Sequence, residues 1–227
     1  ENFASVPLFI TGESEGSLSI DSPSGSNVET VAIASNEQDQ QGVFKELGRW
    51  STGSLDVNSN LSGDWSGNTW VSSNRDATVN IRYTIIQDDN NLAAFEFTDV
   101  VAAGDTIEIT GSSNIELTNL GTSSLTLLIE ASWTAQPGTP PPAPPANTTI
   151  LMEYGSSSRN TGVEISISHV QIRGGGEPFV NEGQSEVTIY VKVYSVFGVD
   201  QILSSSKNSY ELSMGPRDES IWESSVD

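Results

Sequence analysis

The chain has 227 residues, of which 30 are acidic and 9 basic, and its net charge is −21, with no cysteine and one histidine. The absence of thiols and of a second imidazole removes the usual groups for cysteine metal sites and for histidine-assisted nucleophilic catalysis. We therefore expect that the chain is not an enzyme. The acidity also excludes nucleic acid as the expected partner, because phosphate binding needs clustered lysine and arginine.

Residues that favour strands and turns dominate the composition, with serine, threonine, asparagine, glycine and valine abundant. We expect an all-β chain with a β-sandwich or jelly-roll architecture, one short helix and a proline-rich excursion. The expected division is residues 1–135, a linker or loop over 136–146, and strands over 147–227 that complete the same domain or form a second one. No apolar stretch is long enough to span a bilayer.

The first predicted element is an apolar strand or arm over Phe3 to Ile10, where Pro7 favours an edge position. Such an arm could complete the sheet of a neighbouring copy and link copies into a filament, or it could be an ordinary first strand. The residues expected to be buried in that contact are Phe3, Val6, Leu8, Phe9 and Ile10.

Residues 35–47 contain the one predicted helix. Ser35 and Gln38 fit a capping box, and Val43, Phe44 and Leu47 form an apolar face before a glycine.

Oxygen-bearing side chains alternate after this helix and resemble the first ligands of a calcium loop. The candidate ligands are Asp56, Asn58, Asn60 and Asp64. The pattern departs from the calcium-binding consensus, so a strand end followed by a polar turn is the alternative. Calcium is the one candidate cofactor. Asn60 and Asn147 also begin glycosylation sequons.

A strict alternation from Ala77 to Ile85 predicts a half-buried strand, and residues 92–101 predict its hairpin partner across a turn at Asp88–Asn91. Short strands are expected next over 106–110, 114–118 and 123–133. After the proline-rich tract, further strands are expected over 149–154, 163–172, 185–199 and 210–214.

Aromatic residues and the lone histidine are the remaining candidates for a site. Trp50, Trp65 and Trp70 lie among small polar residues and could stack on sugar rings if exposed, or pack in the core if buried. His169 ends an alternating strand and lacks any accompanying catalytic motif, so a packing role is expected.

An apolar N-terminal arm followed by a β domain resembles the donor-strand-linked subunits of extracellular filaments, of the TasA-like and archaeal bundling-pilus kind. That resemblance implies a structural, self-assembling protein. Two alternatives remain open: a carbohydrate-binding or adhesin module, with glycans as partners and calcium as a candidate ligand, and a jelly-roll capsid or surface-layer protein. The strong acidity predicts an extracellular or cell-surface location in saline surroundings.

Overall fold

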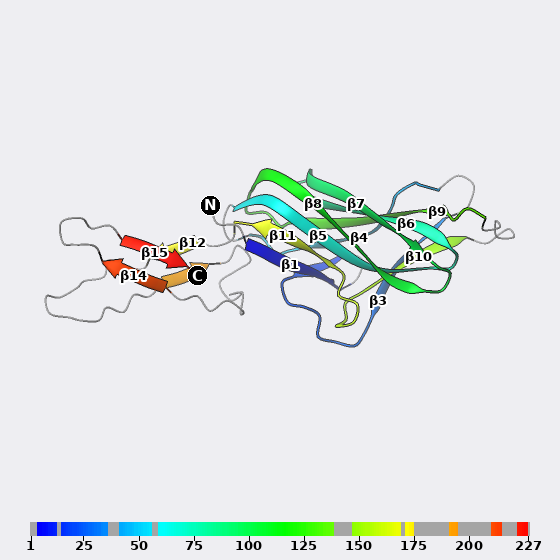
Figure 1. The fold of residues 1–227 in the computed structure, drawn as a ribbon, viewed down its shortest axis with the longest axis horizontal. Coiled ribbons are helices and arrows are strands. Elements are labelled where there is room, and N and C mark those ends of the chain that lie inside the picture. The colour runs from blue at the N-terminus through cyan, green and yellow to red at the C-terminus, as the bar shows by residue number, and fades with distance from the viewer. Residues whose placement is uncertain are drawn as a thin grey trace.

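A computed structural model describes residues 4–12, 15–35, 41–55, 59–138, 147–168, 171–174, 191–194, 210–214 and 222–226. Regular structure in this described part consists of strands alone, which confirms the all-β prediction (Figure 1). Eleven strands form one sheet, and four short strands form two further antiparallel pairs, β12–β13 and β14–β15.

The strands of the large sheet are β1 (Ala4–Thr11), β2 (Glu15–Ser19), β3 (Glu29–Ser35), β4 (Lys45–Ser51), β5 (Ser59–Ser73), β6 (Ala77–Gln87), β7 (Asn90–Val101), β8 (Thr106–Leu120), β9 (Thr126–Ala135), β10 (Thr148–Tyr154) and β11 (Gly162–Ile167). The short pairs are β12 (Gln171–Gly174) with β13 (Val191–Tyr194) and β14 (Tyr210–Met214) with β15 (Trp222–Val226).

The large sheet runs in the order β3-β10-β5-β11-β1-β2-β4-β9-β6-β7, and β8 pairs with the opposite edge of β5 from β11. It folds over on itself, so that β5, β8 and β10 face β4, β6 and β7. Trp65 on β5 meets Phe95 on β7 edge to face at 4.2 Å, and Trp50 on β4 meets Tyr154 on β10 at 5.4 Å. The result is a sandwich in which β10 and β11 complete the sheet begun by residues 4–135.

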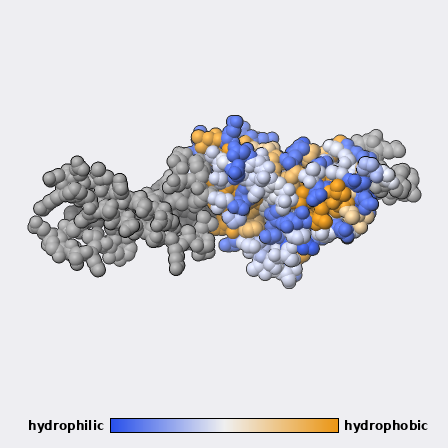
Figure 2. All heavy atoms as spheres, viewed as in Figure 1, coloured by the Kyte–Doolittle hydropathy of each residue, from blue (hydrophilic) through white to orange (hydrophobic). Residues whose placement is uncertain are grey.

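Strand alternation explains which side chains enter the core. On β5 every second residue is buried over most of the strand, and on β6 the buried series begins at Ala77 and continues through Val79, Ile81 and Tyr83. Three tryptophans, Trp50, Trp65 and Trp133, are fully or almost fully buried. The face drawn in Figure 2 is mostly hydrophilic, with separate apolar patches.

A pair of glycines lets aromatic rings approach the backbone of the opposite sheet. Gly67 on β5 pairs with Gly111 on β8. A Cβ atom on Gly67 would lie 2.6 Å from the ring of Tyr83, and one on Gly111 would lie 2.4 Å from Phe97. Because these distances are shorter than any real contact, only glycine allows the two sheets to pack this closely.

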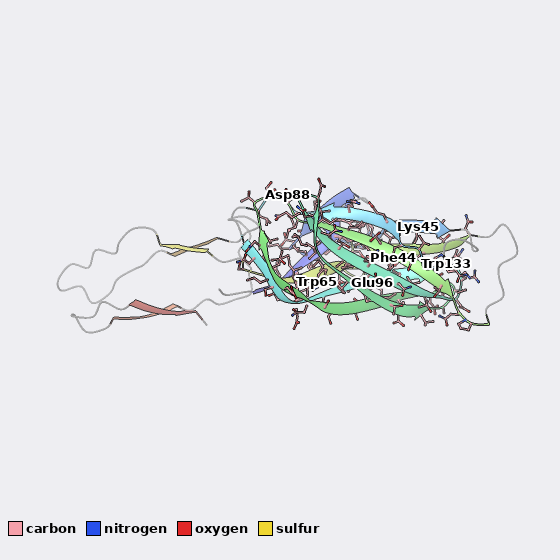
Figure 3. All side chains as sticks on the ribbon, turned by 90° about the horizontal axis from the view of Figure 1, so that it is seen from above. Phe44, Lys45, Trp65, Asp88, Glu96 and Trp133 are labelled. Atoms are coloured by element: carbon pink, nitrogen blue, oxygen red, sulfur yellow. The ribbon has the colours of Figure 1, made fainter. Side chains whose placement is uncertain are left out.

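The predicted hairpin is confirmed. β6 and β7 pair in antiparallel register from Ala77 with Val101 to Gln87 with Asn90, which leaves Asp88 and Asp89 as a two-residue turn. Both have positive φ, 50° and 61°, as a type I′ hairpin turn requires. Figure 3 shows Asp88 and Trp133 toward opposite ends of the sandwich.

The structure differs from the prediction in three regions. Residues 45–47, placed in the helix, belong to strand β4, because Lys45 and Glu46 pair with β9. A bulge between Glu46 and Gly48 lets Leu47 and Trp50 both enter the core. Residues 106–118, predicted as two strands, form one continuous strand, β8. Residues 59–73, for which no strand was predicted, form β5, one of the two longest strands described.

Candidate ligand-binding site on the outer face of the sheet

A hollow of about 630 Å³ opens on the outer face of four adjacent strands, β1, β11, β5 and β8. The side chains on its surface include Pro7, Phe9, Asn68, Thr110, Asn160 and Glu164. They form rows across the sheet, because Phe9 pairs with Gly162, Gly162 with Asn68, and Asn68 with Thr110. A second row passes from Pro7 through Glu164 and Ser66 to Ser112.

Alternation along β1 gives this strand its two faces. Val6, Leu8 and Ile10 are at most 2% exposed and point into the core. Pro7 and Phe9 therefore point outward, and both are only partly covered. The chain thus places the Phe9 ring on the outer surface of the sheet, beside polar side chains of β5 and β8.

Gly162 forms the floor of the hollow between Phe9 and Asn68. A Cβ atom there would lie 2.4 Å from the carbonyl oxygen of Leu8, so β1 approaches β11 only because this position has no side chain. The same absence leaves an open space beside the Phe9 ring.

Hydrogen bonds on both sides hold Asn68 in place. Its Nδ2 donates to Oε1 of Glu108 at 2.9 Å and to the carbonyl oxygen of Asn160 at 3.2 Å. From the core side, the Tyr83 hydroxyl donates to the carbonyl oxygen of Asn68 at 2.8 Å. The position of this amide is therefore fixed before any ligand arrives, which favours specific recognition.

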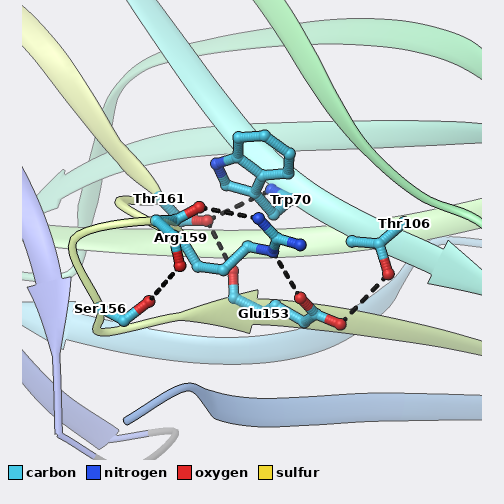
Figure 4. A network of polar contacts seen from close by, with 7 residues as sticks. Trp70, Thr106, Glu153, Ser156, Arg159 and Thr161 are labelled. Carbon is cyan, nitrogen blue, oxygen red and sulfur yellow. Dashed lines mark hydrogen bonds and ion pairs between the residues drawn. The ribbon is translucent and has the colours of Figure 1, made fainter. Parts of the chain in front are cut away.

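A polar network holds the turn that carries Asn160 (Figure 4). Arg159 lies over the ring of Trp70, 4.3 Å from its centroid, and its Nε donates to Oε2 of Glu153 at 2.6 Å. The Thr161 hydroxyl donates to the carbonyl oxygen of Glu153 at 2.8 Å, and Thr106 donates to its carboxylate at 3.2 Å. The β10–β11 turn is thereby tied to β10 through Glu153 and to β5 through Trp70.

A second, smaller hollow of about 440 Å³ lies beside the β6–β7 turn. Arg49, Asp88, Asp89 and several serines surround it. Arg49 is already engaged, since it donates to both carboxylate oxygens of Glu46 at 3.1 Å. This hydrogen bond is the main reason why the pKa of Arg49 is raised. The second hollow thus has a cation that is already neutralised and no aromatic side chain among its described lining residues.

The residues of the predicted assembly arm divide between two places. Phe3 lies outside the described residues. Val6, Leu8 and Ile10 are buried in the core of their own chain, and β1 pairs with β11 on one side and β2 on the other. In this structure β1 is therefore an ordinary internal strand, the alternative that the sequence left open. Phe9, expected to be buried, instead lines the outer hollow.

The two predicted calcium ligands that the structure describes do not lie close together. Asp56 and Asn58 lie outside the described residues. Asn60 and Asp64 both lie on β5, and a four-residue separation along a strand is on the order of 10 Å, too far for one ion. Asp64 accepts a hydrogen bond from Asn114 at 3.1 Å. Among the residues with described side chains, no three acidic or histidine groups form a cluster suited to a metal ion.

The tryptophans predicted as sugar-stacking candidates are not available for that role. Trp50 and Trp65 are buried in the core, and Arg159 covers Trp70. His169 lies outside the described residues. Of the two sequon residues, Asn60 is half-buried on β5 and Asn147 is exposed just before β10. No helix within the described ranges is long and apolar enough to cross a membrane.

No family model matches the chain, and no curated protein is detectably similar in sequence. Among solved structures, a CocE/NonD family hydrolase from Staphylococcus aureus is similar, with a TM-score of 0.52 and 11% identity over 73% of this chain and 36% of that one. An aminopeptidase from a marine sediment Thaumarchaeota archaeon matches with a TM-score of 0.45 and 13% identity, over 72% and 37%. The VP2 protein of infectious bursal disease virus matches with a TM-score of 0.31 and 11% identity, over 62% and 39%.

These likenesses concern the fold, and this chain spans well under half the length of each of these structures. They nevertheless correct one prediction. The expectation that the chain is not an enzyme is contradicted, because a hydrolase contains this fold as part of its chain.

Proposed function

We propose that this chain is a carbohydrate-binding module and that the hollow over β1, β11, β5 and β8 is its binding site. The carrying observation is the pairing of one partly exposed aromatic ring, Phe9, with a pre-positioned amide and neighbouring hydroxyl groups in a space of about 630 Å³. Small-molecule sites fall in the range of about 300–1,000 Å³ and combine apolar surface with a few placed polar groups.

Sugars match this mixture of groups. A sugar ring presents an apolar C–H face and an edge of hydroxyl groups, so it needs a flat apolar surface beside hydrogen-bonding side chains. Phe9 and Pro7 supply the apolar surface. Asn68, Thr110 and Glu164 supply polar groups within the same two rows. Such a module would act outside the cell or at its surface, in agreement with the acidic composition.

Binding measurements on a glycan array, followed by titration calorimetry with the best ligand, test this proposal. Phe9→Ala should weaken binding about tenfold, because the stacking surface is lost. Phe44→Ala is the matched control, since the Phe44 ring lies away from the hollow under the Arg82 guanidinium, 3.7 Å from its centroid. Absence of binding to any glycan, or equal binding by Phe9→Ala and the intact protein, would overturn the proposal.

Filament formation by exchange of β1 is a second proposal. Only three residue pairs join β1 to β2, so β1 could separate from β2 at little cost if two copies exchanged this strand. Exchange would reproduce the same contacts to β11 between two copies instead of within one.

A further inference from the structure

We infer that the outer hollow selects a sugar that carries a protonated amine, with Glu164 as the counter-ion. This inference rests on the proposed function, because it names the ligand class of the same site. It comes from the distribution of charge around the hollow.

Among the described residues, Glu164 is the one ionisable side chain that lines the hollow. The arginine next to Asn160 in the chain, Arg159, is engaged with another carboxylate, because it pairs with Glu153 at 2.6 Å. Within the same part of the chain Glu164 forms no ion pair, and its side-chain partner is the Ser5 hydroxyl, which donates to Oε1. The hollow therefore carries one uncompensated negative charge.

The position of Glu164 suits a substituent of a stacked ring. Glu164 lies two residues along β11 from Gly162, which pairs directly with Phe9. Two residues along a strand span about 7 Å, and the side chains of Phe9 and Glu164 are on the same face of the sheet. A sugar ring over Phe9 would thus direct a substituent on one side toward the Glu164 carboxylate. The Ser5 hydrogen bond restricts where that carboxylate can point.

Charge then separates three classes of sugar. An ammonium group gains an ion pair with Glu164, and the net charge of −21 adds to the attraction. An N-acetylated or hydroxylated sugar gains a hydrogen bond alone. A uronic acid places a second carboxylate beside Glu164, which disfavours binding.

Titration calorimetry with three tetrasaccharides tests the inference: a glucosamine oligomer, an N-acetylglucosamine oligomer and a galacturonate oligomer. The glucosamine oligomer should bind about two- to fivefold more tightly than the acetylated one, the gain expected for an exposed ion pair. The galacturonate oligomer should show no measurable binding. Raising sodium chloride from about 0.05 to 0.5 M should weaken binding of the glucosamine oligomer alone.

Two variants separate the local charge from the overall charge. Glu164→Gln should remove the preference for the amine, because the amide keeps hydrogen-bonding groups at this position but not the charge. Glu116→Gln, an exposed carboxylate on β8 that does not line the hollow, removes the same unit of charge and should keep the preference.

The outcomes distinguish this inference from the function on which it rests. Equal affinity for the amine and acetylated oligomers, or a preference that survives in Glu164→Gln, overturns the inference. If Phe9→Ala still weakens both ligands in that case, the carbohydrate-binding proposal stands. Failure of all three oligomers and of every glycan on the array overturns both.

Discussion

The two faces of the β1–β11–β5–β8 surface are built from the same strands but have opposite properties. On the inner face, Gly67 and Gly111 let Tyr83 and Phe97 approach the backbone, and the aromatic rings occupy the space. On the outer face, Gly162 leaves a space beside the Phe9 ring. Glycine therefore allows the two sheets to pack closely on the inner face and leaves a hollow on the outer face.

The difference teaches that a glycine in a strand has to be judged by what its missing side chain would have met. At Gly67 and Gly111 the neighbours are aromatic rings of the opposite sheet. At Gly162 the neighbour is the backbone of the adjacent strand, and the empty volume lies beside it. Each case yields a different expected response to substitution.

Deleting residues 1–11 should lower the stability most, because it removes β1 from its place in the sheet between β11 and β2. Val6, Leu8 and Ile10 are buried, and each contributes about 1.5–3 kcal/mol when fully buried. The loss also exposes unpaired edges of β11 and β2. We expect no cooperative thermal transition by circular dichroism.

Adding a synthetic peptide of residues 1–12 to the truncated chain sharpens this result. Recovery of the transition would show that β1 can be supplied from outside, as the strand-exchange proposal requires. A truncated chain that folds cooperatively on its own would contradict the placement of β1 as an internal strand.

Gly162→Ala should come next, at about 2–3 kcal/mol of lost unfolding free energy. The added Cβ atom meets the Leu8 carbonyl oxygen at 2.4 Å, and a backbone atom in a paired strand cannot rotate away as a side chain can. Gly53→Ala is the control, since a Cβ atom at that position would have no neighbour within 4 Å among the described residues. Equal stability of the two variants in urea denaturation would show that β1 and β11 are not held this tightly.

Tyr83→Phe should cost about 1–2 kcal/mol, because it leaves the carbonyl oxygen of Asn68 and the hydroxyl of Thr69 without their buried partner. Burial raises the pKa of Tyr83 above its usual value near 10. The unfolded chain therefore releases this proton at lower pH than the folded one. Stability should fall as pH rises above about 10, with a slope of up to about 1.4 kcal/mol per pH unit from this residue.

The pH dependence of stability tests the burial of the Tyr83 hydroxyl separately from the stability lost in Tyr83→Phe. Denaturation at a series of pH values between about 9 and 11 should show a shallower decline for Tyr83→Phe than for the intact protein. Identical slopes would mean that the Tyr83 hydroxyl is reached by solvent in the folded state.

Some of these features can be recognised in the sequence and others cannot. The alternation of Ala77, Val79, Ile81 and Tyr83 is regular, and it predicted the β6–β7 hairpin correctly. The turn is shorter than the predicted Asp88–Asn91, because Asn90 and Asn91 already pair with β6. β5 was not predicted, because its inward positions include Gly67 and Thr69, which are not apolar, and because its serines and asparagines are typical of loops. The first three residues of β4, 45–47, were assigned to a helix because a bulge breaks the alternation of this strand.

The candidate site was harder to foresee, because it depends on pairing between distant segments. The one available signal is Glu164, a carboxylate between Val163 and Ile165 that must point outward. Nothing local shows that Phe9 and Asn68 lie on either side of Gly162, since their separation in the chain exceeds 50 residues. Likewise, Phe9 follows Leu8 in an apolar run, so only the pairing register reveals which of the two faces outward.

Apart from its control, Arg159→Gln should lower stability the least of these variants. It should also weaken ligand binding. The Arg159–Glu153 pair is partly buried, and the guanidinium also covers Trp70, so we expect about 1 kcal/mol of lost stability. Arg49→Gln, which breaks an exposed pair with Glu46, should change stability by less than about 0.5 kcal/mol. Because Arg159 holds the turn that positions Asn160 against Asn68, its loss should weaken ligand binding, while Arg49→Gln should not. If both variants bind equally well, the outer face is held rigid by the core alone and the network in Figure 4 serves only the turn.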